Sequence, residues 1–278
     1  MALSRITVLA ENTATGQGLL AEHGLSLWIE HGGHRILFDT GQGYVLKNNA
    51  RRLNIPLETA DAVVLSHGHF DHTGGLADVL DVEKPPVVFL HPAALAPRYA
   101  RLPDGTSREI GMPDPGVQAV RKRAGLVWTE APTEVCAGVY VTGPVPRQTD
   151  FEDAGGPFFV DCACRQPDEF PDDQALYFET ERGTVVVLGC AHAGVVNTLR
   201  YVQKLTDDRP IHTVIGGMHL VSASPERMDK TVEVLRCLDV QRLLPAHCTG
   251  FAAMARLWHE FPCPYAPCPV GTVLDIEE

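Results

Sequence analysis

The chain has 278 residues, of which 45% are hydrophobic and 21% charged, the ordinary composition of a globular protein. The formal net charge of −12 argues against a nucleic-acid partner, because phosphate backbones are bound by basic surfaces. No run approaches the roughly 18 apolar residues of a membrane span, so no membrane partner is expected. The N-terminus shows no export signal, and eight cysteines in so long a chain do not form a dense secreted disulfide framework. We therefore expect a cytoplasmic protein.

The first half of the chain predicts strands separated by Gly and Asn, with helices between them. The expected strands are 5–12, 25–33, 34–41, 62–68 and 85–92. Residues 43–55 and 74–80 have the apolar spacing of helices. Two stretches rich in Pro and Gly are predicted to be loops around a pair of strands, and long loops of this kind often cover substrates. The loops are 103–116 and 143–173, and the strands are 125–130 and 138–145.

The second half repeats the alternation of strand and helix. It predicts a hairpin over 174–192, and further strands at 211–220, 240–250 and 270–276. Helices are expected at 194–205, 224–238 and 251–261, the second of them opened by Ser224 and Pro225. Two halves of this kind predict one α/β domain over residues 1–278, in which two sheets pack face to face with helices outside.

The segment VVLSHGHFDHTGG (63–75) places four strong metal-binding side chains within six positions: His67, His69, Asp71 and His72. These residues follow an apolar strand and are expected in the loop that leaves it. Alternate residues of an extended segment point the same way, so His67 and His69 can reach one cation. Asp71 and His72 stand where the chain turns into a helix, which brings them to a second position beside the first. Imidazole and carboxylate together favour a divalent ion such as Zn²⁺.

The sequence HGHFDH (67–72) resembles the His-x-His-x-Asp-His signature of the metallo-β-lactamase superfamily. The resemblance implies an αββα sandwich of two mixed β-sheets flanked by helices, with one or two metal ions at the sheet edge. It also implies that Asp39, in ILFDTG, steadies a metal ligand. Further segments are similar to a subgroup that includes the archaeal 7,8-dihydropterin-6-methyl-4-(β-D-ribofuranosyl)-aminobenzene-5′-phosphate synthase. They are EHGLS (22–26), GCAHAGVVN (189–197), GGMHL (216–220) and HCTG (247–250).

The resemblance implies three more ligands from later strand ends: a histidine, an aspartate that bridges two metals, and a final histidine. Cys190 stands where the aspartate is expected, and Cys190, His192 or both complete this part of the site. His247 is the candidate for the final histidine. His219 is either a further ligand or a catalytic residue that contacts the substrate. Without an aspartate at the bridging position, the number of metal ions stays open.

Four other residues are candidates for supporting roles. The subgroup resemblance places His23 near the site, behind the ligands. His91 follows the strand 85–92 and is a candidate for contact with the substrate. Arg121 and Lys122 belong to a basic cluster, which either binds a substrate phosphate or is a solvated helix face.

Together these features predict a metal-dependent hydrolase or transferase for a small phosphorylated or cyclic-ester substrate, with pterin-type compounds among the candidates. We expect one or two Zn²⁺ ions, with Mn²⁺, Mg²⁺ or Fe²⁺ as alternatives. Such an ion lowers the pKa of bound water toward about 7, and Asp71 can orient that water. One alternative is a metal-loaded binding or sensing module without catalysis. Another is a di-iron oxidoreductase, which would be expected to carry Glu in place of His69.

Overall fold

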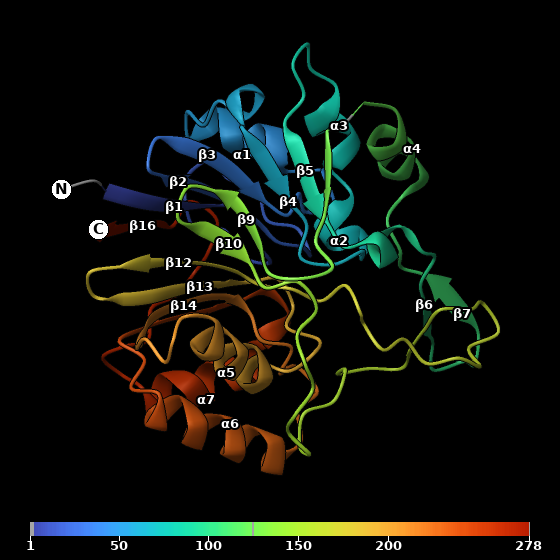
Figure 1. The fold of residues 1–278 in the computed structure, drawn as a ribbon. Helices are drawn as coiled ribbons and strands as arrows, with labels where there is room; N and C mark the ends of the chain where they lie inside the picture. The colour runs from blue at the N-terminus through green and yellow to red at the C-terminus, as the bar shows by residue number, and fades with distance from the viewer. Residues whose placement is uncertain (1–2, 124, 278) are drawn as a thin grey trace.

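The computed structural model describes residues 3–123 and 125–277, and Figure 1 shows two large sheets between layers of helices. The first sheet has the strand order β16-β1-β2-β3-β4-β5-β8. Its strands are β1 (Leu3–Ala10), β2 (Ser26–His31), β3 (His34–Phe38), β4 (Ala62–Val64), β5 (Val87–Leu90), β8 (Leu126–Trp128) and β16 (Val273–Glu277). β3, β4, β5 and β8 are parallel, whereas β16, β1, β2 and β3 are antiparallel.

The second sheet has the strand order β15-β14-β13-β12-β10-β9. Its strands are β9 (Thr133–Cys136), β10 (Val139–Val141), β12 (Leu176–Thr180), β13 (Gly183–Leu188), β14 (Ile211–Gly217) and β15 (Arg242–Ala246). β13, β14 and β15 are parallel neighbours. Each sheet therefore has a parallel part, whose strands all end at the same edge of that sheet.

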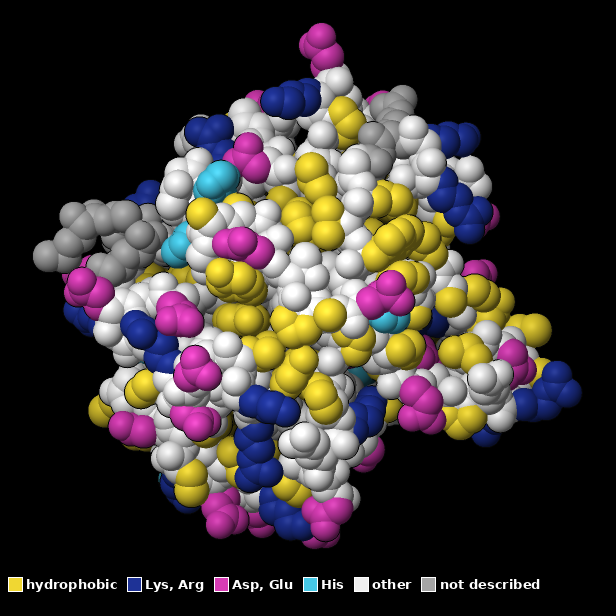
Figure 2. Space-filling model, in the orientation of Figure 1, with side chains coloured by type: hydrophobic (Ala, Val, Ile, Leu, Met, Phe, Trp, Pro, Cys, Tyr) yellow, Lys and Arg dark blue, Asp and Glu magenta, His cyan; other side chains and the backbone are white. Residues whose placement is uncertain are grey.

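Apolar side chains at alternate strand positions fill both faces of each sheet. Val185 and Val187 of β13 point into the layer between the sheets, where they join Leu27 of β2. Val186 of β13 points the other way, toward the helices on the second sheet, and Trp28 of β2 points toward the helices on the first. Figure 2 shows that apolar side chains also cover the middle of one face, where the two halves meet. This layering confirms the predicted αββα sandwich.

The helices lie on the outer faces of the two sheets (Figure 1). α1 (Leu46–Arg52), α3 (Leu76–Leu80) and α4 (Asp114–Arg123) cover the first sheet, and α5 (Val195–Leu205), α6 (Pro225–Cys237) and α7 (Phe251–Glu260) cover the second. The single turns are η1 (Leu57–Thr59), α2 (Phe70–Thr73), η2 (Pro92–Leu95) and η3 (His247–Thr249). α6 begins as expected, because the Ser224 side chain accepts a hydrogen bond from the Arg227 amide. Within the described ranges, no helix has the length and apolar character needed to cross a membrane.

The structure differs from the sequence prediction in the middle of the chain. β6 (Tyr99–Arg101), β7 (Ser107–Glu109) and β11 (Phe158–Phe159) form a third, antiparallel sheet, and β7 and β11 lie in segments that were predicted to be loops. Strands of two or three residues are too short to show an alternating pattern. The predicted strand pair is also wrong: β8 joins the first sheet and β10 joins the second. The predicted helix 74–80 is in fact α3, which α2 precedes, so Asp71 and His72 lie on a helical turn of their own.

Replacing Leu27 with Ala is expected to destabilise the fold, because this side chain is fully buried between the sheets. Removing a buried leucine side chain lowers the unfolding free energy by about 2–5 kcal/mol. Leu20 is 49% exposed and provides the matched control, where the same substitution should cost no more than about 0.5 kcal/mol. Urea unfolding followed by circular dichroism measures both values. An equal loss of unfolding free energy in the two variants would contradict the burial of Leu27 between the sheets.

Candidate metal centre

The candidate ligands come from the carboxyl ends of parallel strands in both sheets. Residues 67–72 follow β4 in the first sheet. In the second sheet, Cys190 and His192 follow β13, His219 follows β14, and His247 follows β15. Because neighbouring parallel strands end at the same sheet edge, their loops gather there, which is where ligands of open α/β sheets bind. Residues separated by well over a hundred positions thus meet at one edge of the sandwich.

His67, His69 and His192 form the first set of candidate ligands. Their side chains are buried, and their ligand nitrogens lie within 4.8 Å of one another. The three Nε2 atoms have no hydrogen-bond partner among the described residues. A buried polar atom without a partner costs free energy, and one divalent cation would satisfy all three nitrogens. The first set therefore fits a metal ion.

Hydrogen bonds at the opposite ring nitrogen orient two members of the first set, His67 and His192. His192 Nδ1 donates to the carbonyl oxygen of Ala154 at 3.0 Å, and His67 Nδ1 lies 2.9 Å from Ser66 Oγ. Ser66 Oγ donates in turn to Asp39 Oδ2 at 2.7 Å. Because the carbonyl and the carboxylate only accept, the ring protons belong on Nδ1. The Nε2 lone pairs are then free to bind a cation.

Asp71, His72 and His247 form the second set. His72 Nε2 lies 3.2 Å from His247 Nε2, and Asp71 Oδ2 lies 3.3 Å from the same His247 atom. His72 Nδ1 donates to Asp39 Oδ2 at 2.7 Å, so His72 also presents Nε2 to its neighbours. A carboxylate and two imidazoles at these separations suit a second divalent ion.

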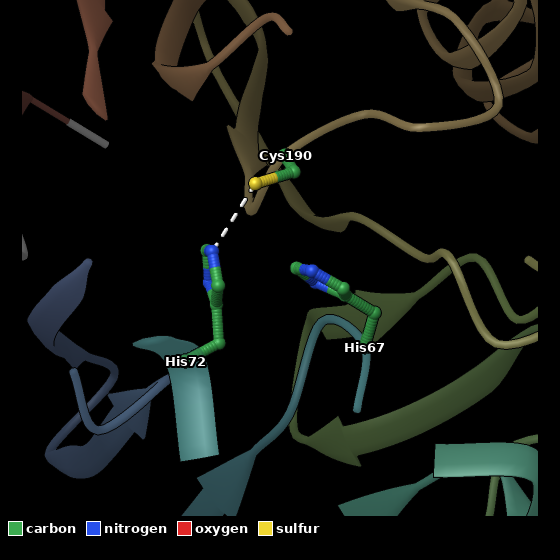
Figure 3. Close-up of side chains that lie close together, drawn as sticks. All are labelled: His67, His72 and Cys190. Atoms are coloured by element: carbon green, nitrogen blue, oxygen red, sulfur yellow. Dashed lines mark hydrogen bonds between the residues drawn. The ribbon is translucent and has the colours of Figure 1, made fainter. Parts of the chain in front are cut away.

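Cys190 lies between the two sets. Its Sγ is 3.1 Å from His72 Nε2, and it shares a possible metal group with His67 as well as with His192. Figure 3 shows His67 and His72, from the segment after β4, and Cys190, from the segment after β13, pointing toward a common space. The structure therefore brings both Cys190 and His192 to the centre. The two sequence alternatives do not exclude each other.

His219 lies against the first set. Its ring centre is 4.3 Å from that of His192, and its buried Nδ1 has no partner among the described residues. Its φ of +44° is left-handed, a conformation that costs a residue other than glycine about 1–3 kcal/mol. Gly155 packs directly on the ring, because a Cβ added there would lie 1.9 Å from His219 Cδ2. The surrounding chain thus holds His219 in place for either of its predicted roles.

Two aromatic rings cover the first set. Phe170 stacks on His192 with ring centres 4.0 Å apart and planes 12° apart. The Phe158 ring lies 5.5 Å from both His69 and His192, and 5.9 Å from His219. Both phenylalanines belong to 143–173, the segment predicted to cover the substrate. They shield the first set from water.

The second set opens toward His23, whose side chain is 61% exposed. His23 Nε2 lies 3.2 Å from Asp71 Oδ2, so this residue lies beside the candidate ligands on their exposed side. Asn12 and Glu11 were missed. Asn12 Oδ1 accepts a hydrogen bond from His247 Nδ1 at 2.9 Å, and Glu11 Oε1 accepts one from the His247 amide at 2.8 Å. The one feature of the sequence that could have indicated them is the pair of polar residues at the end of the first predicted strand.

His91, Arg121 and Lys122 lie outside both sets. His91 Nδ1 accepts a hydrogen bond from the Ala93 amide at the start of η2, which is a capping role. Arg121 and Lys122 are exposed on α4, where Lys122 lines a surface hollow beside Asp78. This position matches a solvated helix face and gives no support to contact with a substrate phosphate.

Burial determines the charge of the first set. It lowers the pKa of all three histidines well below the usual range, so they are neutral at pH 7, the form that binds metal.

Burial also favours a higher pKa for Asp71, but the neighbouring His72 and His23 outweigh it and hold this pKa well below the usual range. Burial raises the pKa of the Cys190 thiol, an effect that a bound cation would reverse.

Residues 20–202 match the model of the metallo-beta-lactamase superfamily. The chain belongs to this superfamily. An uncharacterized protein of Methanocaldococcus jannaschii is 35% identical over 254 residues, covering 91% of this chain and 93% of the relative. A second protein of this archaeon is 31% identical over 273 residues, or 92% of this chain and 91% of the relative. It is named 7,8-dihydropterin-6-methyl-4-(beta-D-ribofuranosyl)-aminobenzene-5'-phosphate synthase.

A solved structure supports the same conclusion. It is described as a metal-dependent hydrolase of the β-lactamase superfamily, with a TM-score of 0.85 and 31% identity over 99% of this chain and 100% of the other. The resemblance seen in the sequence is therefore confirmed, together with the fold class. Membership of the metallo-β-lactamase superfamily implies divalent metal binding, and the named relatives point to an enzyme with a small-molecule substrate.

The Asp39→Asn variant is expected to bind zinc about 10–100-fold more weakly, because Asp39 orients His72 directly and His67 through Ser66. Asp61→Asn is the matched control, since the exposed Asp61 carboxylate accepts a hydrogen bond from the Arg35 amide away from the centre. Competition with a chromophoric zinc chelator measures both affinities. Equal zinc affinities in the two variants would show that Asp39 does not support the ligands.

Asp173 gives a pH-dependent contribution to stability. It is buried, its Oδ2 accepts a hydrogen bond from the Ala193 amide at 2.8 Å, and burial raises its pKa to about 7. An unfolded aspartate has a pKa of about 3.9, so between these values the folded protein holds a proton that the unfolded chain releases. The stabilisation is fully present below the unfolded pKa and is lost as the pH rises through the folded pKa.

Metal-free wild-type protein should therefore lose more unfolding free energy between pH 4 and pH 8 than metal-free Asp173→Asn. Asn keeps an acceptor for the Ala193 amide and removes the titration. Urea unfolding across this pH range measures the difference, with the exposed Asp229→Asn as control. Parallel pH profiles for wild type and Asp173→Asn would contradict the raised pKa.

Proposed function

We propose that this protein is a metal-dependent hydrolase or transferase for a small phosphorylated or cyclic-ester substrate. Among such substrates, we favour one that contains a dihydropterin ring. The proposal rests on the first set, in which three buried Nε2 atoms have no hydrogen-bond partner among the described residues. Beside it lies the second set, which includes a carboxylate. A chance arrangement would not bring the three free Nε2 atoms together and also orient the His67 and His192 rings through hydrogen bonds at Nδ1. The combination favours catalysis by a metal over a purely structural role.

In this proposal the first set would hold one ion, the second set would hold another, and Cys190 would supply a thiolate ligand at the centre. Imidazole and thiolate ligands favour Zn²⁺ over Mg²⁺, which prefers oxygen ligands. A metal bound there would polarise a phosphoryl or carbonyl oxygen and lower the pKa of bound water.

The protein's own residues would position the reacting groups. Asp71 is a carboxylate at pH 7 and lies on the open side of the centre, where it can accept a proton from the attacking group. His23 lies 3.2 Å from Asp71 and is exposed, so it can pass that proton to solvent. His219 would either contact the substrate or complete the first set. Phe158 and Phe170 would keep water away from the covered side.

The relatives support the choice of substrate and reaction. The name of the archaeal synthase supports a dihydropterin substrate, and the description of the solved hydrolase supports attack by water. Both reactions replace a leaving group, and both need the same cation and the same carboxylate. The sequence and the geometry therefore favour a single metal centre, at which the nucleophile is either water or a second substrate.

The His192→Ala variant is expected to lose metal from the first set and to lower turnover more than about 100-fold, since even residues that only orient ligands cost 10–100-fold. His259→Ala, on the exposed face of α7, is the matched control. Elemental analysis counts the ions in each protein. Turnover is measured on a phosphodiester, a lactone and 6-hydroxymethyl-7,8-dihydropterin diphosphate, the last with and without an aromatic amine.

Diphosphate release that requires the amine would identify a transferase, and release without it would identify a hydrolase. A His192→Ala protein that keeps its full metal content and turnover would contradict the assignment of the first set. A wild-type protein that binds metal and converts none of these compounds would favour the binding or sensing module.

A further inference from the structure

A cavity of about 470 Å³ adjoins His247. It lies between the loop after β1, the start of α7, and the segment that precedes β16. Cavities that bind small ligands typically measure about 300–1,000 Å³. A larger hollow between α1 and α3 is lined by none of the candidate ligands. The cavity beside His247 is therefore placed to serve the metal centre.

One wall of this cavity is apolar and largely aromatic. Phe251, Met254 and Tyr265 line it, and Phe251 is 88% exposed at the start of α7. Tyr265 is held by stacking on Trp258, with planes 21° apart. Aromatic rings and a methionine sulfur make favourable contacts with another flat ring. The wall suits a planar ligand that would cover the exposed Phe251 ring.

The charges of the residues that line the cavity argue against binding of the phosphorylated end of the proposed substrate. The described residues that line it include no Lys and no Arg, and they include the carboxylate of Glu11. A phosphate would meet a negative charge there without a cation to offset it. Both Glu11 carboxylate oxygens already accept hydrogen bonds within the protein, from the His247 amide and from Thr13. The hydroxyl oxygens of Thr13 and Thr15 remain to accept hydrogen bonds from N–H groups of a ligand. The lining matches an uncharged ring that carries N–H donors.

Asn12 links the cavity to the metal centre. It lines the cavity, its Oδ1 accepts a hydrogen bond from His247 Nδ1, and its Nδ2 lies 3.5 Å from His23 Nδ1. Building on the proposed function, we propose that the cavity binds the planar, N–H-bearing heterocycle of the substrate. The phosphorylated end then reaches the second set past Asn12 and His23. Phe251 is the main specificity-determining residue in this arrangement.

Pterin, a fluorescent heterocycle without phosphate, tests this inference without any turnover. Zinc-loaded wild-type protein is expected to quench pterin fluorescence on binding. Phe251→Ala should weaken binding about tenfold through loss of the stacking ring, and Met254→Ala should weaken it less. Tyr44→Ala is the matched control, because Tyr44 is an 81% exposed aromatic outside the cavity lining, and it should bind pterin as the wild type does. Inorganic phosphate should not displace the pterin.

Three results would overturn the inference: no pterin binding by the wild type, equal binding by Phe251→Ala, or displacement by inorganic phosphate, which would place the ring at the metal centre. Failure of the proposed function is recognised separately, since a protein that turns over nothing can still bind pterin in a Phe251-dependent way. Conversely, metal-dependent turnover without pterin binding would reject the cavity and keep the proposed function.

Discussion

At the buried end of β3, Asp39 accepts hydrogen bonds from the Ser66 amide, the Ser66 hydroxyl and His72 Nδ1. One carboxylate thereby joins β3 to the loop after β4 and orients histidines of both sets, since Ser66 Oγ also contacts His67 Nδ1. A buried charge is tolerated only when it is satisfied by donors, so the three bonds also explain how the carboxylate can lie there. Asp39 adopts a left-handed φ of +57°, as His219 and His247 do at their own strand ends. The centre is built on strained strand ends that the surrounding contacts hold in place.

The signature loop is also tied to the segment that covers it. The Gly68 amide donates to Asp172 Oδ2 at 2.8 Å, and Asp172 Oδ1 accepts from the buried Arg98 guanidinium at 2.6 Å. Gly68 cannot be replaced by a larger residue without a shift, because a Cβ there would lie 2.4 Å from the Ala94 carbonyl oxygen. Arg98 also pairs with Asp168 at 2.8 Å. These fully buried ion pairs couple the covering segment to the ligand loop, since breaking one would leave an unpaired buried charge.

The two sides of the centre differ in the residues that lie over them. Phe158 and Phe170 shield the first set, whereas the second set opens toward His23 and, through Asn12, toward the cavity beside His247. A substrate that approaches from the open side would meet Asp71 before it meets the covered histidines. Burial strengthens electrostatic interactions with a bound cation in both sets, and the exposed His23 gives the second set its contact with solvent.

The sequence by itself determined the α/β class, the order of most strands and helices, and the ligand signature at residues 67–72. These features are local: alternation, helical spacing and histidine spacing can all be read within a few residues. It also pointed to His23 and Asp39 through resemblance. Only the tertiary structure decided that Cys190 and His192 both reach the centre, that Arg121 and Lys122 lie away from it, and that Glu11 supports His247 from 236 positions away. The reason is physical, because which strand ends share an edge depends on how the two sheets pack, and no local pattern records that.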